Sequence, residues 1–226
     1  MSLACATCPV RDRAACAVLD EAERDELAKA GRTRRLAKGE PLFSAGLSDA
    51  ACATLVSGAL KITSTDSDGR ERILSLVHPS GFVGEMFGPY VQHDVVALGE
   101  SEVCVFSGPA FERAIERYPR LGTALLRRTQ EDLYASRELL SLTGNASAER
   151  RVAGAILSLA RSASDSPCHP ARRFDLPLSR SELADMLGLT IETVSRTLTR
   201  FERAGAIRRD GKRGIELLDP ALLPDT

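Results

Sequence analysis

The chain has 226 residues, of which 43% are hydrophobic and 27% charged, and its formal net charge is −1. This length suits two small globular domains, and no apolar run approaches the roughly 18 residues that a membrane span needs. The N-terminus carries cysteines where a signal peptide would carry a basic start and an apolar stretch, so we expect a cytoplasmic protein with no membrane partner and with reduced thiols.

The first 16 residues contain three cysteines in a C-x2-C-x7-C pattern: Cys5, Cys8 and Cys16. Closely spaced thiolates suit an iron–sulfur cluster or zinc, and a thiol redox switch without metal is a third option. Three ligands leave one position open, and the spacing alone does not choose the fourth. The candidates lie far downstream: Cys52, Cys104 and Cys168.

After a short helix expected at residues 21–30, residues 33–106 show short apolar runs separated by turn signals. This rhythm predicts many short strands in an antiparallel barrel or sandwich. Asp68-Gly69 is a hairpin signal between two of the runs. The fold class is therefore α+β.

Residues 109–118 have a helical pattern, and residues 121–142 are the strongest long-helix candidate. Two interpretations of this helix remain open, and they differ in which of its faces is buried. In one interpretation the helix packs on its own domain through Leu121, Leu125 and Leu139. The other is a partly hydroxylated coiled-coil seam for a homodimer, formed by Leu126, Thr129, Leu133, Ser136, Leu140 and Thr143.

The C-terminal third begins with an amphipathic helix at residues 148–162 and then predicts a helix-turn-helix. Ala184 is small enough for a close helix crossing, Gly188 suits a left-handed helix end, and Thr190 suits an N-cap. An apolar face is available for burial: Leu183, Leu187, Val194 and Leu198. A basic hairpin at residues 209–212, with a returning strand, completes a winged helix-turn-helix.

The second helix of this unit has the chemistry to read double-stranded DNA. Arg196 can bond a guanine bidentately, Glu192 can accept from a cytosine, and Ser195 can reach a base or a phosphate. Phosphate contacts are expected from the remaining polar and basic side chains: Thr193, Thr197, Arg200, Arg208, Arg209, Lys212 and Arg213. The alternative is that Glu192 and Arg196 form an ordinary surface pair at i, i+4.

The chain resembles the CRP/FNR family of bacterial transcription regulators over nearly its whole length, with Glu192, Ser195 and Arg196 matching the FNR-type reading helix. The resemblance implies a dimer on a palindrome with TTGAT-type half-sites. RNA polymerase is an implied partner, through a hairpin around residues 66–72. The implied domains are a cysteine arm (1–19), a cyclic-nucleotide-binding-like β-roll (20–117), a dimerisation helix (118–143) and a winged helix-turn-helix (144–226).

The resemblance also implies how the cysteines are used. FNR-type sensors take their distant ligand from a late strand of the β-roll, which matches Cys104, and the x7 spacing resembles the FnrL/FnrN-like branch. The implied cofactor is a [4Fe–4S] cluster on Cys5, Cys8, Cys16 and Cys104. Cys52 and Cys168 are then ordinary small residues.

A cyclic nucleotide is not expected as the effector. Gly84-Glu85 matches the family's ribose-binding pair, but residues 86–98 contain no arginine or lysine to neutralise a cyclic phosphate. We interpret Gly84-Glu85 as a structural turn, so that cAMP is excluded.

These inferences favour an oxygen-responsive transcription regulator. No catalytic constellation is recognisable, so we do not expect an enzyme. The alternatives are a cluster-free regulator of the same fold that senses nitric oxide or thiol oxidation, and a DNA-binding protein with a zinc-stabilised N-terminus.

Overall fold

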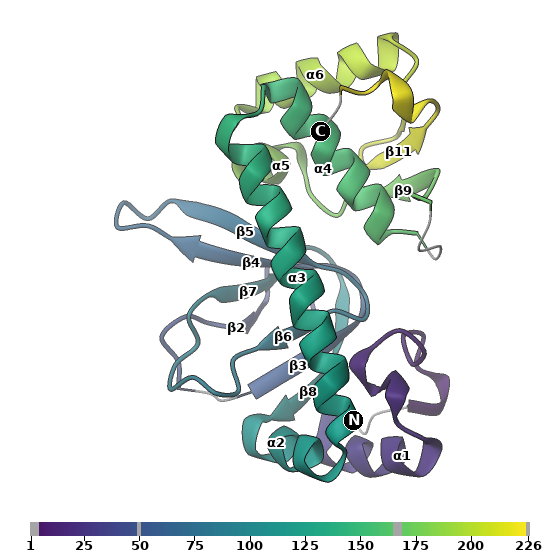
Figure 1. Ribbon diagram of the computed structural model, residues 1–226. Coiled ribbons are helices and arrows are strands. Elements are labelled where there is room, and N and C mark those ends of the chain that lie inside the picture. The colour runs from purple at the N-terminus through teal and green to yellow at the C-terminus, as the bar shows by residue number, and fades with distance from the viewer. Residues whose placement is uncertain (1–4, 49–50, 165–168, 225–226) are drawn as a thin grey trace. The chain divides into compact units, whose positions relative to one another are not determined.

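The computed structural model describes residues 5–48, 51–164 and 169–224 (Figure 1). Two compact units are distinguished. The first contains Met1–Thr65 and Leu74–Tyr134, and the second contains Asp66–Ile73 and Ala135–Thr226. In the described part of the chain, no helix is both long and apolar enough to cross a membrane.

Eight strands form two four-stranded sheets, which confirms the expected antiparallel sandwich and the α+β class. One sheet has the order β1-β8-β3-β6 and the other β2-β7-β4-β5. The strands are β1 (Gly31–Leu36), β2 (Pro41–Phe43), β3 (Ala51–Ser57), β4 (Leu60–Thr65), β5 (Glu71–Val77), β6 (Phe82–Gly84), β7 (Asp94–Ala97) and β8 (Ser101–Ser107).

The strand β8 separates two apolar cores because successive side chains of a strand point to opposite faces. Val103 and Val105 belong to the core shared with residues of the second sheet, such as Leu60 and Val95. Phe106, on the opposite face of β8, packs in a core with residues from the helices.

Helices cover the face of β8 on which Phe106 lies (Figure 1). Two of these helices, α1 and α2, contact each other at one end of the sandwich. Two short 3-10 segments, η1 (Cys5–Thr7) and η2 (Ala15–Val18), precede α1 (Glu21–Ala30). Asp20 and Glu23 form a reciprocal capping box that defines the start of α1. Next come α2 (Gly108–Arg117) and α3 (Pro119–Asn145), which confirm the two predicted helices.

The second unit contains a helix-turn-helix and a small sheet, as predicted. Its helices are α4 (Ala148–Ser162), α5 (Arg180–Leu187) and α6 (Ile191–Arg203), and a 3-10 turn, η3 (Pro220–Leu222), follows. The sheet has the order β10-β11-β9, formed by β10 (Ile207–Asp210), β11 (Gly214–Leu217) and β9 (Arg173–Asp175). The sequence did not predict β9, because three residues are too few for a periodic pattern.

The turn between α5 and α6 has the expected construction. Gly188 ends α5 in the left-handed conformation with φ of +61°. The Thr190 hydroxyl accepts a hydrogen bond of 3.2 Å from the Thr193 N–H and so caps α6. The Arg151 guanidinium on α4 donates to the Leu187 carbonyl at 3.0 Å, which ties the end of α5 to α4.

Candidate functional site

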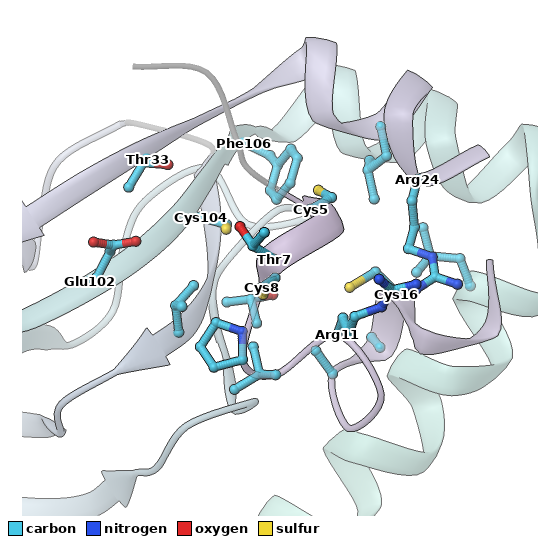
Figure 2. A pocket seen from close by; sticks show the side chains of 18 of the residues that line it. Cys5, Thr7, Cys8, Arg11, Cys16, Arg24, Thr33, Glu102, Cys104 and Phe106 are labelled. Atoms are coloured by element: carbon cyan, nitrogen blue, oxygen red, sulfur yellow. The ribbon is translucent and has the colours of Figure 1, made fainter. Parts of the chain in front are cut away.

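Four cysteines line one cavity of about 130 Å³ in the first unit (Figure 2). They are the four that were expected to act together: Cys5, Cys8, Cys16 and Cys104. Cys5 lies in η1, Cys16 in η2 and Cys104 in β8. A cavity that holds a single water molecule needs about 10–15 Å³. The cysteine-lined cavity is therefore large enough for a group of several atoms.

The position of Cys104 follows from strand register. It pairs with Thr33 of β1 and with Thr54 of β3, so it stands in the middle of a three-strand segment. Directly opposed residues share one face of a sheet, and so do alternate residues of one strand. Thr33, Thr54, Glu102 and Phe106 accordingly line the same cavity as Cys104.

The N-terminal arm curls back on itself through local backbone hydrogen bonds. The Cys5 carbonyl accepts from the Cys8 N–H at 3.4 Å, and the Cys16 carbonyl accepts from the Leu19 N–H at 3.1 Å. Cys8, Cys16 and Cys104 pack together against a small apolar cluster, formed by Val10, Ala14 and Val56. Apolar packing therefore brings the arm to β8.

Burial raises the pKa of three of these thiols. The pKa of Cys16 rises to about 11 and that of Cys104 to about 12, first because both are desolvated and then because Cys8 lies near. Burial likewise raises the pKa of Cys5. Thiols in such an environment stay protonated near neutral pH unless a cation favours the thiolate.

The other two cysteines stand apart from this cavity. Cys52 is fully buried in the core between β3 and the helices, and burial raises its pKa to about 12. It does not line the cavity. Cys168 lies outside the described residues. Among those residues, no three His, Cys, Asp or Glu side chains are grouped closely enough to hold a single metal ion.

Arg24 and Arg11 also line the cavity and were missed from the sequence. Arg11 donates to the Ala6 carbonyl at 2.9 Å and so braces the arm itself. Arg24 lies in the first half of α1, where a cation opposes the helix dipole. A cation is unusual at this position of a helix. This was the signal in the sequence that could have drawn attention to Arg24.

The helix α6 presents the expected reading residues. Val194 and Leu198 are fully buried, while Glu192 and Arg196 are exposed. Hydrogen bonds from its own backbone and from Thr190 hold the pKa of Glu192 below its usual value. The predicted alternative, a surface ion pair between Glu192 and Arg196, is not formed in the described part of the chain. Arg196 is therefore not engaged by Glu192, whose carboxylate accepts from Thr190 and from its own backbone.

Among the residues expected to contact phosphates, Thr197 needs correction, and Arg200 and Thr193 have contacts within the chain. Thr197 is only 6% exposed, because it lies on the same helical face as Val194 and Phe201, so its side chain cannot reach a phosphate. Arg200 is exposed but pairs with Glu149. The Thr193 hydroxyl lies 3.1 Å from that of Thr190.

The wing arginines are also engaged within the domain. Arg208 pairs with Glu216, which is 5% exposed, and Arg209 pairs with Glu202. The Arg213 guanidinium lies 3.5 Å from the Pro177 carbonyl. Lys212 is exposed, with no hydrogen bond or ion pair to any described residue. Of the wing cations, Lys212 is thus the one without a partner among the described residues.

The helix α3 presents two different faces. Leu121 and Leu125 pack into the core of the first unit, as the self-packing interpretation expected, but Leu139, its third residue, is half-buried and does not belong to that core. The seam leucines Leu126, Leu133 and Leu140 are 70%, 49% and 67% exposed. The Thr129 hydroxyl donates to the Leu125 carbonyl at 3.0 Å, which satisfies it within the helix.

Gly84 and Glu85 have a structural explanation. Gly84 has φ of +118°, and a Cβ there would lie 2.3 Å from the Ala51 carbonyl oxygen. The Glu85 carboxylate accepts a hydrogen bond of 2.9 Å from the Gln92 N–H and so closes the intervening loop. This geometry gives the pair a structural role, although not that of a turn: Gly84 allows a close approach to β3 at the end of β6, and Glu85 ties the loop that follows.

Two family descriptions match the chain. Residues 33–118 match the cyclic nucleotide-binding domain, and residues 150–225 match the Crp-like helix-turn-helix domain. A β-sandwich joined by a long helix to a winged helix-turn-helix is the architecture of a DNA-binding regulatory protein.

Curated relatives match almost the whole chain. It is 35% identical over 222 residues to the transcriptional activator protein FnrL of Cereibacter sphaeroides, covering 97% of this chain and 90% of FnrL. It is 36% identical to the nitrogen fixation regulation protein FixK of Bradyrhizobium diazoefficiens, covering 96% and 91%. The structure of FixK2 from Bradyrhizobium japonicum matches with a TM-score of 0.76 and 26% identity over 87% of this chain and 98% of that one. The chain belongs to the CRP/FNR family of transcription regulators.

Proposed function

We propose that this protein is an oxygen-responsive transcription activator with a [4Fe–4S] cluster on Cys5, Cys8, Cys16 and Cys104. The observation that carries the proposal is that these four thiols, from the arm and from β8, line one cavity. Relatives named as a transcriptional activator and as a nitrogen fixation regulation protein support the role in transcription regulation.

The distribution of the thiols favours a cluster over a single zinc ion. A tetrahedral zinc site needs all four sulfurs about 2.3 Å from one atom. In a cluster, each cysteine binds a different iron, so the ligands surround a larger volume. The four thiols surround a cavity, and no described group is compact enough for one metal ion. When bound, the cluster would supply a link between arm and β8 that oxygen can destroy.

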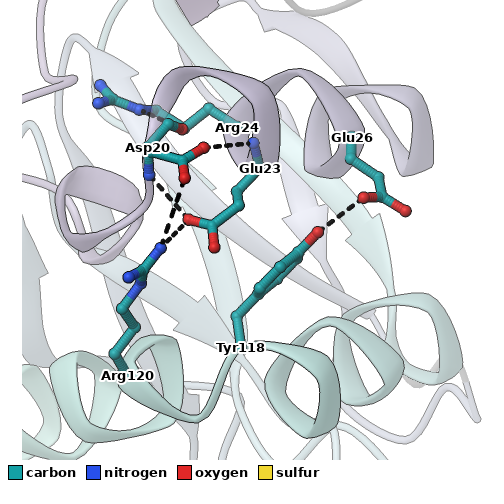
Figure 3. A network of polar contacts seen from close by, with 6 residues as sticks. All are labelled: Asp20, Glu23, Arg24, Glu26, Tyr118 and Arg120. Carbon is teal, nitrogen blue, oxygen red and sulfur yellow. Dashed lines mark hydrogen bonds and ion pairs between the residues drawn. The ribbon is translucent and has the colours of Figure 1, made fainter.

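The arm connects to the start of α3 through α1 (Figure 3). Asp20 and Glu23, at the N-terminus of α1, both form ion pairs with Arg120 in the first turn of α3. The Tyr118 hydroxyl donates to Glu26 of α1 at 2.7 Å. The placement of the arm and α1 can therefore bias the placement of α3.

The exposed seam of α3 is the proposed dimer contact, with Thr129 and Ser136 keeping the pairing marginal. A switch needs only a few kcal/mol between its states. Pairing of two copies would set the two α6 helices one DNA turn apart on a palindrome.

Leu133→Glu tests this seam. Burying one leucine contributes about 1.5–3 kcal/mol, and a dimer contains two copies of the position. We expect the dimer dissociation constant to rise by at least ~100-fold, measured by anaerobic sedimentation. The control is Ala135→Glu, an exposed position off the seam. Equal effects of the two substitutions would contradict the seam.

For DNA, we propose TTGAT-type half-sites read by Glu192, Ser195 and Arg196, with Lys212 on a phosphate. Thr193 and Arg200 remain candidates for backbone contacts. RNA polymerase is the proposed second partner, through the hairpin loop between β4 and β5. The effector is not proposed to be cAMP, because residues 86–98 offer no cation for its phosphate.

The decisive experiment is an anaerobic visible spectrum with iron and sulfide analysis, repeated in air. We expect a brown protein with about four irons per chain that bleaches in air. A colourless protein containing zinc would instead support the zinc-stabilised alternative. A metal-free protein would leave a regulator that responds to another signal, such as thiol oxidation or nitric oxide.

A further inference from the structure

Arg24 is a cation in the wall of the cysteine-lined cavity, and its guanidinium has fewer hydrogen-bond acceptors than donors among the described residues. Its side chain reaches from α1 to the cavity and lies beside Cys16 (Figure 2). The Nε atom donates to the Asp20 carbonyl at 3.3 Å (Figure 3). The Nη1 atom is buried and finds no hydrogen-bond acceptor among the described residues. Within those residues, Arg24 also forms no ion pair.

Local structure does not account for this arrangement. A buried donor without an acceptor destabilises a fold, and more so when it is charged. The first turns of a helix also favour anions over cations. By contrast, Arg120 forms ion pairs with Asp20 and Glu23. These two carboxylates at the start of α1 thus pair with Arg120 and not with Arg24. Among the described residues, Arg24 is therefore a cavity-lining cation whose positive charge has no acidic partner.

We infer that Arg24 is the counter-charge and hydrogen-bond donor for an anionic iron–sulfur group in the cysteine-lined cavity. This inference rests on the proposed function. Four thiolates outweigh the positive charge of an iron–sulfide core, and the sulfurs accept N–H hydrogen bonds. Arg24 would thus be a positioning residue that retains the group and sets its reduction potential through the positive charge of its guanidinium at the cavity wall.

The test compares two variants that remove one positive charge from the same helix. Arg24→Met removes the proposed donor, and Lys29→Met removes an exposed cation in the last turn of α1. Both proteins are reconstituted anaerobically beside the wild type. Spectroelectrochemistry then gives the reduction potential, and an iron chelator gives the rate of iron loss.

We expect Arg24→Met to shift the potential to a more negative value, because a nearby cation stabilises the reduced and more anionic state. Iron loss should accelerate at least several-fold. Lys29→Met should match the wild type in both measurements, and Arg24→Lys, which keeps the charge, should lie between the wild type and Arg24→Met. Equal potentials for Arg24→Met and Lys29→Met would overturn the inference.

The apo protein separates this function from a purely structural one. Without the cluster, Arg24→Met removes an unpaired buried donor together with the hydrogen bond of 3.3 Å to the Asp20 carbonyl, so its melting temperature should stay close to that of apo wild type. An apo variant that melts well below apo wild type would show that Arg24 stabilises the fold and would overturn the inference. A wild-type chain that takes up neither iron nor sulfide would overturn the proposed function itself, and that outcome is visible before any variant is studied.

Discussion

Arg196→Met is expected to remove sequence-specific DNA binding without disturbing the fold. Arg196 is exposed, and its neighbours Val194 and Leu198 supply the buried face of α6. A bidentate arginine–guanine contact discriminates by about 1–3 kcal/mol, and a palindrome contains two of them. We therefore expect an affinity loss of roughly thirty-fold to twenty-five-thousand-fold, measured by fluorescence anisotropy at fixed salt.

The control for this prediction is Arg203→Met, which removes an exposed cation from the last turn of the same helix. Its effect should be small and similar for specific and unrelated duplexes. Replacing the guanine of each half-site should weaken wild-type binding but change the binding of Arg196→Met little. If Arg196→Met weakens both duplexes equally, Arg196 contacts phosphates and not bases.

Cys104→Ala should abolish assembly of the cluster. Cys104 is the one described cysteine of the cavity that comes from the sheet, so the arm would retain three thiols without their partner across the cavity. We expect iron and sulfide to fall from about four per chain to near zero, and anaerobic DNA binding to fall to the aerobic level. Anaerobic absorption and metal analysis measure the first effect.

Cys52→Ala is the matched control, because Cys52 lies in a neighbouring strand of the same sheet but outside the cavity. It should lose some stability through the small void left in a buried core, but it should retain the cluster. A brown Cys104→Ala protein, or a colourless Cys52→Ala protein, would show that the ligand set is wrong.

Much of this architecture could be predicted from local patterns. Asp68-Gly69 predicted the turn between β4 and β5, and Gly188 and Thr190 predicted the turn between α5 and α6. These signals are local because each reflects one backbone conformation or one cap. The convergence of the four cysteines was different, since it was implied by resemblance and not by their spacing.

The features that were missed depend on distant pairing. Whether Arg208 is free for a phosphate depends on Glu216, which is opposite it in the neighbouring strand. Arg209 is engaged by Glu202, from the preceding helix. Arg24 could be recognised as unusual in its helix, but its access to the cavity required the fold. Thr197 was assigned to the wrong face of α6. Counting the helical period would have placed it on the buried face with Val194 and Phe201.

The alternation along β8 has an evolutionary consequence. Val103 and Val105 maintain the sandwich, while Glu102, Cys104 and Phe106 line the cavity. Substitutions at the second set can change what the cavity holds without altering the residues that hold the two sheets together. One strand thus separates the residues that shape the cavity from those that pack between the two sheets.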